Sequence, residues 1–210
     1  YTERLMNAVQ KELRLDRQPR HIECFDNSNL QGAHPVASCV VFRDGKPSRK
    51  EYRHFNIKTV TGADDYASMR EVVFRRYTRL MAEGAEMPDL IIADGGKGQM
   101  GVIHEVLERL GLDIPIAGLA KDDRHRTAEL LCGFPPVLVG IRPTSPLFHF
   151  LAHIQEEVHR FAVSFHRQKR SKAFIHSELE QIEGVGDKTV QTLLRHFRTV
   201  EKVRAANIEE

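Results

Sequence analysis

The chain has few cysteines, and none of them is paired at short spacing. Its 210 residues include only Cys24, Cys39 and Cys132, which lie far apart. Short C-x-x-C pairs are typical of zinc modules, and even numbers of closely spaced cysteines are typical of disulfide frameworks. The cysteine pattern therefore argues against both classes and indicates a reducing, cytoplasmic location.

Long apolar runs and a dominant sign of charge are also missing. No apolar stretch reaches the roughly 18 residues that a membrane span needs, so we expect no membrane partner. No signal-peptide pattern opens the chain, which begins and ends inside patterned segments as a fragment of a longer protein would. The 31 basic and 29 acidic residues give a net charge of +2. A nucleic-acid binder of this composition must concentrate its positive charge locally.

The hydrophobic residues, 41% of the chain, first follow the periods of one helix and three strands. Residues 1–14 show helical spacing, and residues 21–27, 36–43 and 48–57 show the alternation or the β-branched content of strands. Asp44-Gly45 predicts a tight turn between the second and third of these strands.

From residue 67 the pattern changes to helices alternating with short apolar strands. Helical spacing covers residues 67–83 and 98–110, with Gly84 and Gly111 at the helix stops. Short apolar strands are expected at 89–93 and 114–120, a hairpin at 127–131 and 137–141, and a long helix at 147–168. A meander followed by β-α-β units predicts an α/β fold, a mixed sheet with helices packed on it.

A polar connector at residues 171–176 indicates a domain boundary. We expect a first domain over residues 1–172 and a small all-α domain over residues 177–210.

Carboxylates stand at the ends of two predicted strands. Asp26 lies near the end of the first strand and Asp94 at the end of the fourth, while Asp64 and Asp65 precede the first long helix. Hard oxygen ligands from separate elements suit Mg²⁺ or Mn²⁺, which assist phosphodiester cleavage. The alternative is that the strand-end aspartates only solubilise the sheet edge and that Asp64 is a helix N-cap.

The segment Asp94-Gly95-Gly96-Lys97-Gly98-Gln99 suggests a phosphate loop but does not match one. The phosphate-loop pattern needs a Ser or Thr directly after its lysine, and this segment has none. Its glycines can still allow close approach of a DNA backbone, with Lys97 nearby. The alternative is a plain strand-to-helix turn.

The long helix carries His149, His153 and His159, but no H-E-x-x-H motif, which argues against a zinc hydrolase. A histidine beside a metal-carboxylate centre can act as general acid or base. Basic residues follow at Arg167, Lys169 and Arg170, and such clusters neutralise phosphates without reading sequence. The alternative is that these residues only form a solvated or packed helix face, which is the commoner case.

Residues 179–197 fit a helix, a glycine hairpin and a second helix. Gly184, Val185 and Gly186 form the hairpin, and Lys188 opens the helix that follows. Backbone N–H groups at such a turn, together with the next helix N-terminus, make an anion nest suited to a DNA phosphate. This helix-hairpin-helix unit usually works as a pair, and no second hairpin follows here. The alternative is an ordinary helix turn.

From about Asp16 to its end, the chain resembles the C-terminal half of the UvrC family of bacterial excision-repair endonucleases. The matching segments occur in order at residues 15–17, 19–20, 22–26, 37–42, 64–69, 88–89, 92–99, 157–162, 166–167 and 184–186.

The resemblance implies an RNase H-like endonuclease domain followed by tandem helix-hairpin-helix motifs. It places the family's acidic residues on Asp26, on Asp65 rather than Asp64, and on Asp94, and its histidine on His159 rather than His153. It implies Mg²⁺- or Mn²⁺-dependent incision of damaged double-stranded DNA on the 5′ side of a lesion. The 3′ nuclease and the region that contacts the UvrB–DNA complex are expected to lie outside this chain.

Two features depart from the family's commoner pattern. Asn27-Ser28-Asn29 stands where many members read I-S-H, and the charged run from Lys121 to Arg126 has no firm role, although Asp122 and Asp123 resemble metal ligands. Two other functions stay open. One is an RNase H-like nuclease acting on branched DNA, and the other is a non-catalytic DNA-binding module.

Overall fold

The computed structural model describes residues 1–28, 35–60, 64–121 and 127–209. The chain forms two compact units, Tyr1–Ala162 and Val163–Glu210. The elements of the first unit are α1 (Thr2–Glu12), β1 (His21–Ser28), β2 (Val36–Arg43), β3 (Lys46–Pro47), η1 (Arg49–Glu51), β4 (Arg53–Asn56), α2 (Asp65–Ala82), β5 (Leu90–Ala93), α3 (Lys97–Leu110), β6 (Ile116–Lys121), β7 (Thr127–Cys132) and β8 (Val137–Val139). The helix α4 (Pro146–Glu180) runs into the second unit, which also holds α5 (Asp187–Phe197) and α6 (Val200–Ala205).

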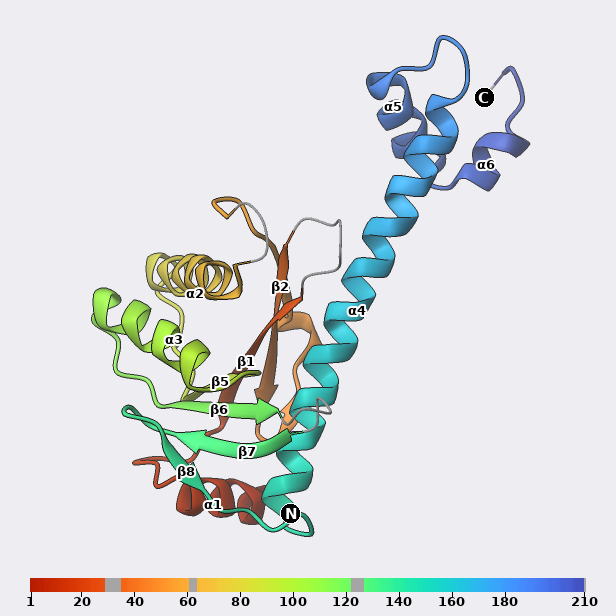
Figure 1. The fold of residues 1–210 in the computed structure, drawn as a ribbon. Helices are drawn as coiled ribbons and strands as arrows, with labels where there is room; N and C mark the ends of the chain where they lie inside the picture. Colours follow the sequence, from red (N-terminus) through yellow and green to blue (C-terminus); the bar gives the residue numbers. More distant parts are fainter. Residues whose placement is uncertain (29–34, 61–63, 122–126, 210) are drawn as a thin grey trace. The chain divides into compact units, whose positions relative to one another are not determined.

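The sheet is mixed, as the sequence predicts. Its strands lie in the order β3-β2-β1-β5-β6-β7-β8, and β4 pairs with β2 (Figure 1). The strands β1, β5 and β6 are parallel to one another, while the remaining pairs are antiparallel. The predicted meander and the β-α-β units are both confirmed.

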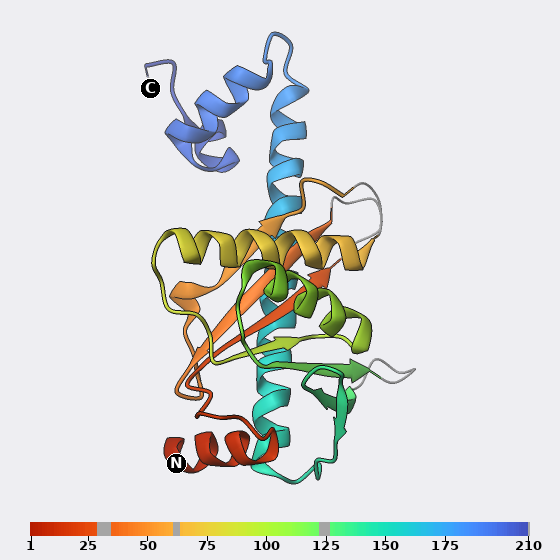
Figure 2. The same ribbon diagram turned by 90° about the vertical axis from the view of Figure 1, so that its left-hand side faces the viewer.

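Helices cover both faces of this sheet, and each face has its own hydrophobic core. The helices α2 and α3 lie on one face, and α1 and the first part of α4 lie on the other (Figures 1 and 2). Side chains of a strand alternate between the faces. On β1, Ile22 and Cys24 therefore pack with α1 and α4, whereas Phe25 packs with α2 and α3.

The predicted turn between β2 and β3 is confirmed. Asp44 and Gly45 have φ angles of 52° and 79°, and Arg43 pairs with Lys46. Two consecutive positive φ angles define the turn whose twist matches that of antiparallel strands.

The prediction of one strand over residues 48–57 is wrong. The chain forms the short 3₁₀ helix η1 there and resumes pairing only at β4. The Glu51 carboxylate accepts hydrogen bonds from Arg43 Nε at 3.0 Å and from Ser48 Oγ at 2.6 Å. These bonds hold a tight turn where alternation alone predicts an extended chain.

The prediction of a connector at residues 171–176 is also wrong, because α4 continues through them to Glu180. No glycine or proline interrupts residues 147–183, and polarity alone does not end a helix. The two compact units meet inside this helix at Ala162 and Val163. The domain limits 1–172 and 177–210 remain a proposal. Within the described ranges, no helix has both the length and the apolar content needed to cross a bilayer.

A buried charged cluster joins β1 to α2. Arg76 donates from Nε to Glu23 Oε1 and from its terminal nitrogen to Oε2, both at 2.7 Å, and Tyr77 Oη donates to Oε1 at 2.9 Å. Burial raises the pKa of Glu23, but the hydrogen bonds from Arg76 and His21 outweigh it and lower that pKa to about 2. The charge of the Glu23 carboxylate is thus fully balanced by its hydrogen-bond partners.

We expect Glu23→Gln to lower the free energy of unfolding by about 3 kcal/mol at pH 7, because it leaves the buried Arg76 without its counter-charge. A carboxyl group whose folded-state pKa is depressed stabilises the fold above its unfolded value, and loses this effect as the pH falls. The difference in free energy of unfolding between wild type and variant should therefore shrink as the pH falls from 4.5 towards 2. Urea unfolding at pH 7 and at pH 3 measures it.

The control is Glu83→Gln, which breaks the exposed pair between Arg79 of α2 and Glu83, the C-cap of that helix. This change should alter stability by less than about 0.5 kcal/mol. Equal losses in the two variants would contradict the role given to the buried cluster.

Candidate active site

The carboxyl ends of three parallel strands meet at one edge of the sheet, and each carries a charged residue. Asp26 lies near the end of β1, Asp94 directly follows β5, and Lys121 ends β6. Phe25 pairs with Ala93, and the backbone N–H of Asp94 donates to Phe25 O at 3.0 Å, so the two aspartates follow neighbouring positions of adjacent strands. Ligand sites of such sheets form at this edge.

Both aspartates point to the face that α4 covers. Asp26 continues the alternation of Ile22 and Cys24 along β1, and Asp94 continues that of Leu90 and Ile92 along β5. The sequence prediction that two carboxylates share one edge thus has a structural basis in strand register.

The side chain of Asp94 is only 2% exposed, and both of its oxygens have partners. Lys121 Nζ lies 3.1 Å from Oδ2, and Gln155 Nε2, on α4, donates to Oδ1 at 3.0 Å. Sequence reasoning missed both partners. Lys121 had no assigned role, and nothing in the sequence brings Gln155 to a strand 61 residues away.

The negative charge of Asp26 is not balanced by its neighbours. Burial, together with the charge of Asp94, raises its pKa to about 7, against a smaller lowering by Lys121 and a further small rise from Asp65. Two carboxylates that share a site disfavour each other's ionisation, and a bound cation would relieve this repulsion.

Asp65 approaches the pair from the other face of the sheet. Asp64 is the N-cap of α2, with its carboxylate accepting from Ala67 N at 3.0 Å, and Asp65 is the first residue of that helix. Asn27, next to Asp26, donates from Nδ2 to Asp65 O at 2.7 Å. The charge of Asp65 is close enough to act on Asp26, whereas Asp64 serves as the helix cap. The choice of Asp65 over Asp64 as a site residue stays a prediction.

His159 lies one helical turn beyond Gln155 on α4, and its ring is exposed. Residues four apart share a face of a helix, so His159 follows Gln155 along the side that contacts Asp94. Two residues after His159 on α4, Phe161 stacks on the ring of His54 of β4, with ring centroids 3.6 Å apart. His54 pairs with Ser38 of β2, and Ser38 pairs with Asp26 of β1. This part of α4 therefore lies at the level of Asp26. His153 instead packs its ring against Phe42.

The loop after Asp94 borders a hollow of about 680 Å³ between the N-termini of α2 and α3. Its lining includes Asp65, Tyr66 and the exposed Lys97. A side chain at Gly98 would overlap the Tyr66 ring, so this glycine serves the packing of α2 against α3. The sequence left open a glycine loop that lets a DNA backbone approach. That role of the loop stays a prediction.

The glycine hairpin of the second unit has the predicted geometry. Gly184 has a φ of 83°, Val185 N donates to Ile182 O at 3.1 Å, and Gly186 is the N-cap of α5 without a side-chain cap. A core of Leu179, Val190 and Val200 holds the helices together.

The structure describes some of the basic side chains that are predicted to bind phosphates. Lys188 and Arg167 are exposed, whereas the side chains of Lys169 and Arg170 lie outside the described ones. Asp122, Asp123 and Asn29 lie wholly outside the described residues. Among the described residues, no group of three or more His, Cys, Asp or Glu side chains is arranged to hold a metal ion.

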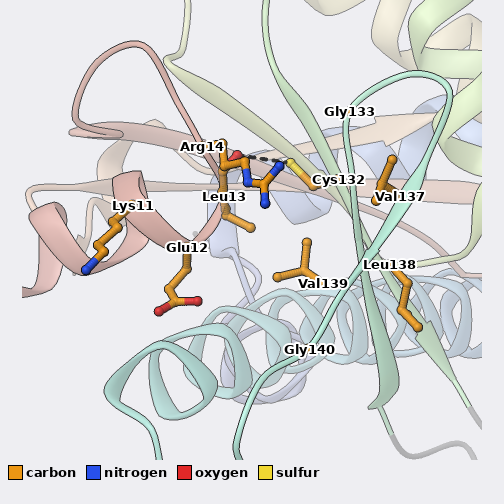
Figure 3. A pocket seen from close by; sticks show the side chains of 10 residues that line it. All are labelled: Lys11, Glu12, Leu13, Arg14, Cys132, Gly133, Val137, Leu138, Val139 and Gly140. Atoms are coloured by element: carbon orange, nitrogen blue, oxygen red, sulfur yellow. Dashed lines mark hydrogen bonds between the residues drawn. The ribbon is translucent and has the colours of Figure 1, made fainter.

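A second hollow, of about 540 Å³, lies where the end of α1 meets β7 and β8 (Figure 3). Cys132 Sγ lies 3.5 Å from Leu13 O in its wall. Cys132 pairs with Ala117, at the opposite end of β6 from Lys121, so this hollow is remote from the acidic pair. Its lining contains one carboxylate, Glu12, and so lacks the paired acids of the strand-end site.

Two solved structures are similar to part of the chain at low identity. The endonuclease V of Ciona intestinalis in complex with DNA is 14% identical, covers 59% of this chain and 60% of its own, and has a TM-score of 0.38. The Argonaute of Clostridium butyricum bound to guide and target DNA is 10% identical, covers 67% of this chain and 20% of its own, and has a TM-score of 0.35. Both likenesses are too distant to support an argument about function.

Sequence relatives are much closer. The UvrABC system protein C of Bacteroides fragilis is 60% identical over 207 residues, which are 99% of this chain and 34% of that protein. The protein of the same name from Streptococcus uberis is 58% identical over 94% of this chain and 34% of its own length. The chain spans about a third of the length of these relatives. The family described as UvrC RNAse H endonuclease domain matches residues 10–163, which include Asp26, Asp65, Asp94 and His159. The resemblance seen in the sequence is therefore confirmed, and the chain belongs to the UvrC RNase H endonuclease domain family.

Proposed function

We propose that this chain is a divalent-metal-dependent DNA endonuclease that hydrolyses a phosphodiester on the 5′ side of a lesion during excision repair. The observation that carries the proposal is the pair formed by Asp26 and Asp94 at one sheet edge, with the pKa of Asp26 raised to about 7. Membership of an endonuclease family supports the reaction class.

The residues at this edge fit Mg²⁺ or Mn²⁺. Carboxylate oxygens are hard ligands, and the raised pKa of Asp26 marks a site with more negative charge than its neighbours neutralise. Asp26 and Asp94 would hold the metal, and Asp65 would complete the acidic set from the N-terminus of α2. A metal bound there would polarise the phosphate and activate water.

The chain's own residues would do the remaining work. Gln155 fixes the orientation of the Asp94 carboxylate, and His159 would transfer a proton at the attacking water or the leaving oxygen. Lys97, Arg167, Lys169 and Arg170 would bind backbone phosphates, and so would the hairpin formed by Gly184, Val185 and Gly186 together with Lys188. Such contacts position a duplex without reading its sequence.

The substrate and partner follow from the relatives and stay proposals, because the chain spans a third of their length. The relatives carry the name UvrABC system protein C, which describes one component of a multi-protein system. We propose that this system acts on damaged double-stranded DNA in the cytoplasm. Contact with the UvrB–DNA complex would use regions beyond this chain. The two functions left open by the sequence, a nuclease for branched DNA and a non-catalytic module, are outcomes of the first experiment below.

The first experiment measures incision of nicked plasmid DNA with Mn²⁺ by wild type and Asp94→Ala, with the nick standing in for the earlier 3′ cut. We expect the cleavage rate of the variant to fall at least about a hundredfold. Loss of a residue that only supports a metal ligand already costs about 10–100-fold, and loss of the ligand itself should cost more. The matched control is Asp64→Asn, which keeps the helix cap and should cut at the wild-type rate.

Equal cleavage by wild type and Asp94→Ala would overturn the assignment of the acidic pair. Preference for intact branched DNA over the nicked substrate would favour the branched-DNA nuclease. DNA binding unchanged by every acidic substitution, with no cleavage in wild type, would favour the non-catalytic module.

Asp26→Asn should stabilise the metal-free protein at pH 8. A carboxyl group whose folded-state pKa is raised contributes most below its unfolded value, and loses this contribution as the pH rises through the folded value. The gain in free energy of unfolding of the variant over wild type should therefore be absent below pH 3.8 and grow to roughly 2–4 kcal/mol above pH 7. Urea unfolding in EDTA measures it.

The control for this prediction is Asp113→Asn, an exposed carboxylate in the loop before β6. It accounts for the general effect of removing one negative charge. If Asp26→Asn is no more stable than wild type at pH 8, burial and the charge of Asp94 do not destabilise an ionised Asp26 in the metal-free protein.

Lys188→Gln should weaken duplex binding several-fold and reduce the slope of log K against log salt by about 1, because one phosphate contact is lost. Lys202→Gln, in α6 of the same unit, should leave both quantities unchanged. Fluorescence anisotropy over a salt series measures them. If the two variants behave alike, the hairpin is not the binding element.

A further inference from the structure

Lys121 is placed where a cation is needed. It ends β6, the strand next to β5, and its ammonium lies 3.1 Å from Oδ2 of Asp94. The side chain is 36% exposed, whereas the carboxylate that it contacts is 2% exposed. The ammonium therefore reaches from solvent into the same edge that collects Asp26 and Asp94.

The charge at this edge is unbalanced without a further cation. If Asp26, Asp65 and Asp94 are all ionised they carry three negative charges, and Lys121 supplies one positive charge. The positive charge of Lys121 acts on Asp26 but does not cancel the effects of burial and Asp94. One divalent ion would bring these four side chains to neutrality. A second divalent ion would add two positive charges beside the ammonium, and like charges at such separations repel strongly.

The Asp94 carboxylate keeps free acceptor positions alongside its present partners. A carboxylate offers about four lone-pair positions, and Gln155 and Lys121 occupy one on each oxygen. One position on each oxygen remains, and a metal bound there would displace neither partner. A lysine ammonium on a flexible stem can also turn to a phosphate oxygen when a strand is bound.

We propose that Lys121 is a catalytic residue that takes the place of a second metal ion, so that the site binds one divalent ion and the ammonium contacts a non-bridging oxygen of the scissile phosphate. The inference rests on the proposed function. It predicts opposite effects on metal binding and on cleavage, because the fixed charge repels the metal but stabilises the phosphate.

The experiment measures Mn²⁺ stoichiometry and affinity by electron paramagnetic resonance, without DNA, at pH 8. Wild type should bind one ion at the acidic edge. Lys121→Met keeps the aliphatic stem and should bind Mn²⁺ roughly tenfold more tightly, yet cleave nicked DNA at least about a hundredfold more slowly. Lys121→Arg keeps the charge and should stay within a few-fold of the wild-type affinity.

The matched control is Lys46→Met. Lys46 pairs with Arg43, which lies opposite His21 at the other end of β1 from Asp26. This variant should match wild type in both measurements. Thermal melting of every variant confirms that each one is folded before its metal affinity is compared.

A merely structural lysine would hold Asp94 in place, so Lys121→Met would then weaken Mn²⁺ binding. Weaker or unchanged binding in that variant, or two ions in wild type, would overturn the inference. Asp94→Ala separates this failure from failure of the proposed function. If Asp94→Ala loses Mn²⁺ while Lys121→Met does not tighten it, only the role of Lys121 falls. If Asp94→Ala binds Mn²⁺ as wild type does, the metal site itself is wrong.

Discussion

Parallel pairing of β1, β5 and β6 is the constraint on which the site depends. It brings the ends of three strands to one edge, and alternation then directs Asp26 and Asp94 to the same face. A shift of one residue in the pairing of β1 with β5 would send one carboxylate to the opposite face. The two hydrophobic cores resist such a shift, because it would also turn Ile22 and Phe25 away from their helices.

The strand β1 carries two acidic residues with opposite electrostatic surroundings. Glu23 faces α2, where Arg76 and its neighbours lower its pKa to about 2. Asp26 faces α4, where burial and Asp94 raise its pKa to about 7. One carboxylate is thus satisfied by the protein and stabilises the fold. The other carries a charge that its neighbours do not neutralise, and this contrast makes Asp26 the candidate for a functional acid.

Much of this organisation could be predicted from the sequence, because it depends on local patterns. Alternation located β1, β-branched content located β2, short apolar runs located β5 and β6, and Asp44-Gly45 located the hairpin turn. The break at η1 and the continuation of α4 escaped prediction. The first depends on a side-chain hydrogen bond to Glu51, and the second on the absence of a helix breaker in a polar segment.

The candidate site was predictable only in part. Two aspartates at strand ends can be expected to meet once the strands are parallel, and the family resemblance named Asp65 and His159. Lys121 and Gln155 could not be found in this way, because their contacts with Asp94 depend on strand order and on the rotation of α4 over the sheet.

The most direct test of the account is the titration of the Asp26 carboxyl group by carbon NMR, with and without Mg²⁺, using Asp26→Asn to assign the signal. The account predicts a pKa near 7 in EDTA and an ionised Asp26 at pH 6 once Mg²⁺ is bound. A carboxyl group that titrates near its ordinary value of 3.8, or one that Mg²⁺ leaves unchanged, would contradict the claim that this pair is a cation site.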